Sequence, residues 1–514
     1  MMMKWKLWRK RRKKEIPLHF LIFASLREDG TLPPDFVIPF YKENRKRNRI
    51  RFARAMMPPR EQDVAPLYHV IRLALHKVGG DYERADKALN AYFAPKKGRT
   101  IKRIILPLRA WVKENCAQQA KQIYWYANHL LNNAQNPECL GFALTLLQFL
   151  DIGDDECITK KVRLLSKCEA LAPLCLFLMI DWPNANAELF ALAKSVRGMG
   201  RELAVEYLNA DTPEICDWLL HEGWRSCAHY VDLELTCALK VNLFAMLRER
   251  RLQPGDFSAA VTLTARIVHN GEDIGKLGDP TEPLRALLHY AWDCASTPDD
   301  YLALCQIRHY LRSAYLSGGA DLLGGYNALL SSPSSQACAR RALADPCKET
   351  RILHLRLASN LGIDCTQAVL EGLEKDFLQY TILLDIIISD GALIPRLLRL
   401  AYRRLPLVRI ALTPPRFVSV RLLLRTKSFA YLVQWLRNAP GWGCTLIFCA
   451  LCSRIDTCRA DAIGALENWI GYEVDIGPLC RLALWVLLQR ENDAAQRERI
   501  TKILDHFDIF GILY

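Results

Sequence analysis

The residues with the most distinctive chemistry stand at the start of the chain, where two tryptophans alternate with eight basic side chains. Lysine and arginine neutralise phosphates, and tryptophan stacks on nucleobases or inserts at a lipid interface. The composition predicts a polyanion-binding arm whose partner is nucleic acid or an anionic membrane. The other interpretation is a solvated tail that only adds solubility. The predicted site comprises Lys4, Trp5, Lys6, Trp8, Arg9, Lys10, Arg11, Arg12, Lys13 and Lys14.

Positive charge is concentrated in the N-terminal part of the chain. The 514 residues include 69 Lys and Arg against 55 Asp and Glu, a net charge of +14. The first 60 residues hold 17 of these basic residues and only five acidic ones, a net charge of +12. The remainder is therefore nearly neutral, and the overall charge does not predict a basic surface along the whole protein.

The cysteines are the next candidates for chemistry, since the chain contains 18 of them. Cys449 and Cys452 form a C-x₂-C pair, and with Cys444 and Cys458 they supply enough thiolates for a tetrahedral zinc ion. However, the segment reads as an apolar helix, and no second C-x₂-C pair follows it. The pattern favours metal-free cysteines buried in a core. Because no disulfide-framework spacing occurs, it also predicts a reducing, cytoplasmic location.

Motifs for catalysis and cofactor binding are absent from the sequence. None of the 11 histidines forms a His-x₃-His or Glu-x₂-His pair, and His221 and His229 read as structural or surface residues. There is no dinucleotide fingerprint, phosphate loop or nucleophile elbow. The acidic pairs 154–155 and 299–300 read as helix caps. The sequence therefore predicts no metal site and no evident cofactor.

Helical periodicity begins after Pro66 and continues to the C-terminus, with short turns and almost no period-2 alternation. Pro107 is expected to open a long helix, with Trp111, Ile123, Tyr126, Leu130 and Leu131 facing inward. The pattern predicts an all-α fold in which more than half of the residues are helical and fewer than about 5% lie in strands. The predicted domains are a disordered basic arm (1–15), a loop-rich module with seven prolines (16–66) and a helical repeat-like domain (67–514).

Residues 203–223 have the pattern of a helix pair: an apolar helix, a turn with Thr212 as cap and Pro213 at the first helical position, and a second apolar helix. Similar pairs occur at 364–405 and 460–488, so the pattern recurs at about 40 residues. Residues ~67–510 thus resemble HEAT-type helical repeats. The resemblance implies stacked antiparallel helix pairs in an α-solenoid-like array behind the basic, proline-rich N-terminus. A plain multi-helix globular domain is the alternative.

The apolar run Ile16–Leu26 has the composition of a signal-peptide core, but Pro17 and His19 interrupt it. Apolar stretches elsewhere are shorter than the ~20 residues of a membrane-spanning helix. The sequence therefore predicts a soluble protein.

Residues 16–40, which include Ile16–Leu26 and Asp29–Phe36, resemble the opening of bacterial proteins labelled limonene hydroxylase. The resemblance implies a monooxygenase that hydroxylates a cyclic monoterpene, with or without subsequent alcohol oxidation, and with a nicotinamide or iron cofactor. It supplies no site residue. The leading hypothesis is instead a non-enzymatic helical scaffold that binds a peptide or protein, since no catalytic constellation is evident.

Overall fold

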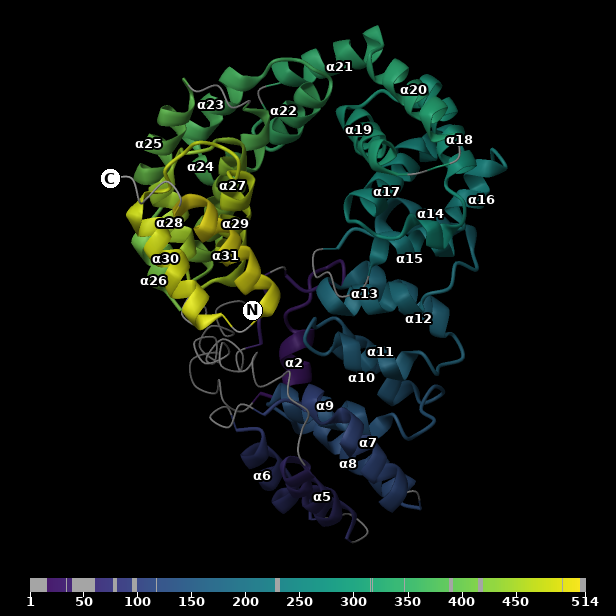
Figure 1. Cartoon of the computed structure of the whole chain (residues 1–514). Coiled ribbons are helices and arrows are strands. Elements are labelled where there is room, and N and C mark those ends of the chain that lie inside the picture. The colour runs from purple at the N-terminus through teal and green to yellow at the C-terminus, as the bar shows by residue number, and fades with distance from the viewer. Residues whose placement is uncertain are drawn as a thin grey trace, which may run out of the picture. The chain divides into compact units, whose positions relative to one another are not determined.

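The fold was analysed in a computed structural model of the chain. It describes residues 16–33, 35–38, 61–76, 81–94, 99–116, 118–226, 232–314, 316, 318–345, 347–387, 392–414, 419–491 and 493–508. Helices hold 73% of these residues, and none of them lies in a strand (Figure 1). The predicted all-α class is confirmed for this part of the chain. The predicted polyanion-binding arm, residues 4–14, lies outside the described residues.

Two compact units make up the chain, an N-terminal unit (Met1–Tyr290) and a C-terminal unit (Ala291–Tyr514). The sequence pattern does not mark this division, because helical periodicity runs through it. The first long helix, α5, spans Glu61–Leu75 and includes Pro66. It therefore begins earlier than the proline-rich composition of residues 16–66 predicts.

The N-terminal unit is built from α-helices and a few short 3₁₀ or π turns. Its elements are α2 (Leu18–Phe23), α5 (Glu61–Leu75), α6 (Tyr82–Tyr92), η2 (Ile101–Arg103), α7 (Ile105–Asn115), α8 (Ala120–Asn133), α9 (Pro137–Leu147), α10 (Glu156–Ser166), α11 (Ala172–Met179), α12 (Ala185–Ser195), α13 (Gly198–Tyr207), α14 (Pro213–Trp218), η3 (Leu219–Gly223), α15 (Leu233–Lys240), α16 (Leu243–Arg248), η4 (Pro254–Asp256), α17 (Phe257–His269) and η5 (Ile274–Leu277). Helix α18 (Thr281–Cys294) runs across the division into the second unit.

The C-terminal unit continues the same construction. Its elements are α19 (Pro298–Ser313), α20 (Gly319–Leu330), α21 (Pro333–Ala344), α22 (Arg351–Asn360), α23 (Thr366–Lys375), α24 (Phe377–Tyr380), η6 (Thr381–Ile386), α25 (Ile394–Arg404), α26 (Leu407–Leu412), α27 (Val420–Trp435), η8 (Leu436–Asn438), α28 (Cys444–Leu451), α29 (Asp456–Asn468), α30 (Gly477–Arg490) and α31 (Ala494–Asp508).

Alternate helices of the N-terminal unit contact one another in succession. The series runs α7, α9, α11, α13, α15 and α17, and several of its members also pack against a sequence neighbour, as α9 does against α8 and α13 against α12 (Figure 1). Helices inside such a row are covered on several sides, so they carry apolar residues all round. All eleven residues of α9 are buried, as are seven of the eight residues of α11.

Helices of the C-terminal unit show the same alternation near the end of the chain. Contacts link α26 to α28 and α28 to α30, and they link α27 to α29 and α29 to α31. Between these helices lies one apolar core, in which Trp469 and Phe429 are fully buried. This core is the main source of stability for the segment, because buried apolar area drives folding.

Helix caps in the structure match the sequence pattern at three places. Thr212 accepts a hydrogen bond from the Ile215 N–H, with Pro213 at the first helical position of α14. Asp155 accepts from the N–H groups of Cys157 and Ile158 at the start of α10. Asp300 forms a capping box with Thr297 at the start of α19. These side chains satisfy backbone donors that a helix leaves free at its N-terminus.

The prediction of one long helix from Pro107 is wrong, because the helix there is shorter than expected. The chain forms two helices there, α7 and α8, separated at Cys116–Gln119. Ile123, Tyr126, Leu130 and Leu131 are buried as predicted, but on the second helix. Trp111 is only half-buried and stacks on Tyr68 at a ring-centroid distance of 4.4 Å.

Within the described residues, no helix is both long enough and apolar enough to cross a membrane.

Candidate functional site

A cavity of about 680 Å³ opens in the N-terminal unit, between the N-terminal segment and the ends of four helical elements. Residues 27–33 and 36–38 form one part of its lining, and η2, the α10–α11 link and the junction of α12 with α13 form the other. The volume lies within the range of small-molecule pockets, roughly 300–1,000 Å³. We call it the basic cavity. Its charged lining residues are Arg27, Asp29, Lys102, Lys167, Glu169, Lys194, Arg197 and Arg201.

Basic side chains outnumber acidic ones in this lining by six to two. Lys102, Lys194 and Arg197 are exposed, whereas Lys167 and Arg201 are half-buried. Burial lowers the pKa of the Lys167 ammonium and of the Arg201 guanidinium, because the charged form loses hydration. An anion in the cavity would therefore interact with cations that water solvates incompletely.

Four of the six cations form no ion pair within the described residues, although Asp29 and Glu188 lie near enough to attract Arg27 and Lys167. Within the described residues, no carboxylate oxygen lies within 4.0 Å of the side-chain nitrogens of Arg27, Lys102, Lys167 or Arg197. By contrast, the Lys194 Nζ lies 3.3 Å from a Glu214 carboxylate oxygen. Unpaired cations that converge on one cavity give it a positive potential.

Arg201 is held in place by its neighbours. Its guanidinium lies over the Trp218 ring at 5.1 Å from the centroid, and Nη2 donates a hydrogen bond to the Glu222 carbonyl oxygen. Its Nε is buried and has no hydrogen-bond partner. A stacked, oriented guanidinium with a free donor is suited to bind an oxyanion.

The two acidic residues of the cavity are engaged locally. Asp29 accepts hydrogen bonds from the backbone N–H and the hydroxyl of Thr31, which lowers the pKa of its carboxyl. Glu169 lies against Gly198, the first residue of α13: a Cβ at Gly198 would be only 2.2 Å from Glu169 Oε1. Gly198 also has φ +64°, a conformation that favours glycine. The Glu169 carboxylate thus complements the positive end of the α13 dipole.

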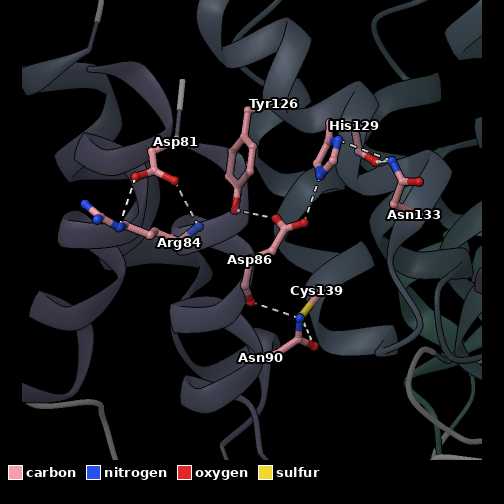
Figure 2. Close-up of polar contacts among 8 residues, drawn as sticks. All are labelled: Asp81, Arg84, Asp86, Asn90, Tyr126, His129, Asn133 and Cys139. Atoms are coloured by element: carbon pink, nitrogen blue, oxygen red, sulfur yellow. Dashed lines mark hydrogen bonds and ion pairs between the residues drawn. The ribbon is translucent and has the colours of Figure 1, made fainter. Parts of the chain in front are cut away.

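A second polar cluster links α6, α8 and α9, and Figure 2 shows it. The His129 Nε2 lies 2.8 Å from Asp86 Oδ2, and the Tyr126 hydroxyl donates to Asp86 Oδ1 at 3.3 Å. Burial raises the pKa of both Tyr126 and Cys139, so phenol and thiol stay protonated at neutral pH. Cys139 therefore lacks the thiolate that a nucleophile requires. The cluster thus links α6 to α8 and α9 through polar side chains.

A third cluster surrounds His221, which the sequence pattern assigns a structural or surface role. Its Nε2 lies 3.1 Å from Asp256 Oδ1 and 3.6 Å from Asp217 Oδ1. These three residues are the only group within the described part of the chain whose ligand atoms come close enough to share a metal ion. The geometry suits a divalent cation that is held by one imidazole nitrogen and two carboxylate oxygens. His229 lies outside the described residues.

Asp217 and His221 have the i, i+4 spacing of a helix face, which the sequence displays. Asp256 comes from η4, so only the tertiary structure brings it to His221.

Within the described residues, no three thiols of Cys444, Cys449, Cys452 and Cys458 lie close enough together to share a metal ion. The prediction that all four cysteines are buried in a core is wrong. Cys458 is buried, but Cys444 and Cys449 are half-buried and Cys452 is exposed. The buried face of α28 consists of Leu446, Ile447, Ala450 and Leu451. Residues 444, 449 and 452 fall beside that face because of the 3.6-residue period.

Glu272 is expected to make the N-terminal unit less stable as the pH rises. The pKa of Glu272 is raised from 4.5 to about 7, chiefly by burial and also by repulsion from Glu234 and Asp232. The folded state then binds this proton more tightly than the unfolded chain does. The free energy of unfolding therefore falls between about pH 4.5 and 7, and does not change further above that range.

The variant Glu272→Gln should match the wild-type melting temperature at pH 5 and exceed it at pH 8. The exposed Glu282→Gln is the matched control. Equal pH dependence of the wild type and Glu272→Gln in thermal unfolding would contradict this assignment.

Comparison of the chain with protein-family models, with curated proteins and with solved structures found no match in any of the three.

Proposed function

We propose that the protein is a helical interaction scaffold whose N-terminal unit binds a polyanion. The observation that carries this proposal is the basic cavity, with six cations against two acidic residues. The basic arm at residues 4–14 is also positively charged, and it precedes the cavity residues in the sequence. Long-range attraction by such an arm and close contacts in a cavity act together on an anionic partner.

We also propose that the helices form an α-solenoid-like array of stacked pairs, of the HEAT type, that binds a peptide or protein. Contacts between alternate helices in both units support this arrangement. Helix α30 carries an exposed apolar stripe of Leu479, Leu482 and Trp485, which is the kind of surface that protein partners cover. The absence of disulfides among the 17 described cysteines supports a cytoplasmic location.

The test is binding of a fluorescein-labelled single-stranded oligonucleotide to the full chain, measured by anisotropy between 50 and 200 mM NaCl. We expect binding that weakens steeply with salt, because cation–phosphate contacts release counterions. Vesicles with acidic lipids serve as the second probe, and tighter binding to them would assign a membrane as partner. A protein that binds neither probe at 50 mM NaCl would refute polyanion binding.

The alternative proposal is hydroxylation of a cyclic monoterpene, which is supported by the resemblance of residues 16–40. An iron ion would bind at Asp217, His221 and Asp256. This set fits only partly, because non-haem iron oxygenases use two histidines and one carboxylate. Stoichiometric iron, or limonene-dependent consumption of reduced nicotinamide, would support this alternative over the scaffold.

A further inference from the structure

We propose that the basic cavity binds a compact polyphosphate, a small molecule with at least two phosphate groups. This inference rests on the proposed polyanion-binding function and names the ligand class of one site. It concerns the lining of the cavity alone, so it can fail while the basic arm still binds an extended polyanion.

The charge of the lining favours more than one phosphate. Six basic and two acidic side chains give a formal charge of +4. A phosphate monoester carries about −1.5 to −2 at pH 7, so two groups balance the cavity and one does not. Four of the cations form no ion pair with a carboxylate within the described residues, and they come from four separate parts of the chain. A ligand with several phosphates can contact them simultaneously.

The residue types that line the cavity favour a small ligand over a nucleic acid strand. Strand-binding surfaces combine a basic groove with several aromatic rings on which successive bases stack. Phe36 is the only aromatic residue among those that line the cavity. The remaining apolar lining is aliphatic, with Leu32, Pro33, Val37 and Ile38 on the same segment. A phosphorylated compound fits this lining, with its phosphates toward the helix ends.

The α13 N-terminus supplies a further element of the site. Arg197 is its N-cap residue and makes no side-chain cap, while the Glu169 carboxylate lies against Gly198. Backbone N–H groups at a helix N-terminus bind phosphates. A ligand phosphate would therefore compete with Glu169, and Glu169 opposes binding by its like charge. Removal of this charge should strengthen binding.

The experiment is isothermal titration of the full chain with inorganic pyrophosphate in magnesium-free buffer, with inorganic phosphate as comparison. We expect pyrophosphate to bind at least tenfold more tightly than phosphate. Lys102→Ala/Arg197→Ala should weaken pyrophosphate binding at least tenfold and leave the melting temperature of the free protein unchanged, since both side chains are exposed. Glu169→Gln should tighten it several-fold.

The matched control is Arg109→Ala/Lys113→Ala, which removes one arginine and one lysine from the exposed face of α7. It should bind pyrophosphate as the wild type does, and an equal loss in this control would show that the effect is non-specific charge. Unchanged affinity in Lys102→Ala/Arg197→Ala or in Glu169→Gln would place the binding outside the cavity. Each of these results overturns the inference.

The same proteins are titrated with the labelled oligonucleotide. Oligonucleotide binding without pyrophosphate binding would refute the cavity ligand and leave the proposed function intact. Failure to bind either probe would refute both.

Discussion

Replacement of Trp469 by alanine is expected to lower the free energy of unfolding of the C-terminal unit by about 3–5 kcal/mol. Trp469 lies at the C-terminal end of α29, and its side chain is the largest fully buried one in the apolar core. Its Nε1 donates a hydrogen bond to the Leu436 carbonyl oxygen at 2.9 Å. Truncation removes buried apolar area, leaves a cavity and takes away one of two donors to that carbonyl, which also accepts from the Ala439 N–H.

Urea-induced unfolding followed by circular dichroism measures this effect, and hydrogen exchange assigns it to α27 and α29. Trp485→Ala is the matched control, because Trp485 is 56% exposed on α30. Its replacement should change stability by no more than about 0.5 kcal/mol. Trp469→Phe should be intermediate, since phenylalanine keeps most of the apolar area but cannot donate to Leu436. Equal losses for the two alanine variants would contradict the core position of Trp469.

Deletion of Met1–Lys14 is expected to remove most of the affinity for polyanions while leaving the melting temperature nearly unchanged. The segment contains eight basic residues but only a few large apolar ones, so it contributes little to a core. Each lost phosphate contact lowers the salt dependence of binding to a single strand by about 0.7 in log K against log salt. Eight lost contacts would therefore reduce the slope by about 5–6.

Anisotropy of the labelled oligonucleotide between 50 and 200 mM NaCl measures both affinity and slope. A variant with Trp5 and Trp8 replaced by alanine, and all cations retained, separates stacking from charge: it should keep the slope and lose part of the affinity. Pyrophosphate binding at the basic cavity should not change upon the deletion. Equal oligonucleotide affinity of the intact and truncated proteins at low salt would mean that the arm only adds solubility.

The helical class and much of the local structure were predictable from the sequence, because both depend on residues close together in the chain. Inward positions on α8 follow from the 3.6-residue period, and the caps at Asp155, Thr212 and Thr297 follow from residue type at a helix start. Prediction was poorer where a local signal had to be weighed against packing. Examples are the start of α5 before Pro66 and the break between α7 and α8.

By itself, the sequence determined the helical class of the described residues and the concentration of charge near the N-terminus, and it offered one C-x₂-C pair without a second. Only the tertiary structure decided which of the basic residues act together. Arg27, Lys102, Lys167 and Arg201 are far apart in the sequence, where no pattern connects them. They meet at one cavity because residues 27–33 and 36–38 lie beside η2 and the ends of α10, α12 and α13. Periodicity sets which face of a helix is buried, but the choice of neighbouring helices depends on long-range side-chain packing, which no local pattern encodes.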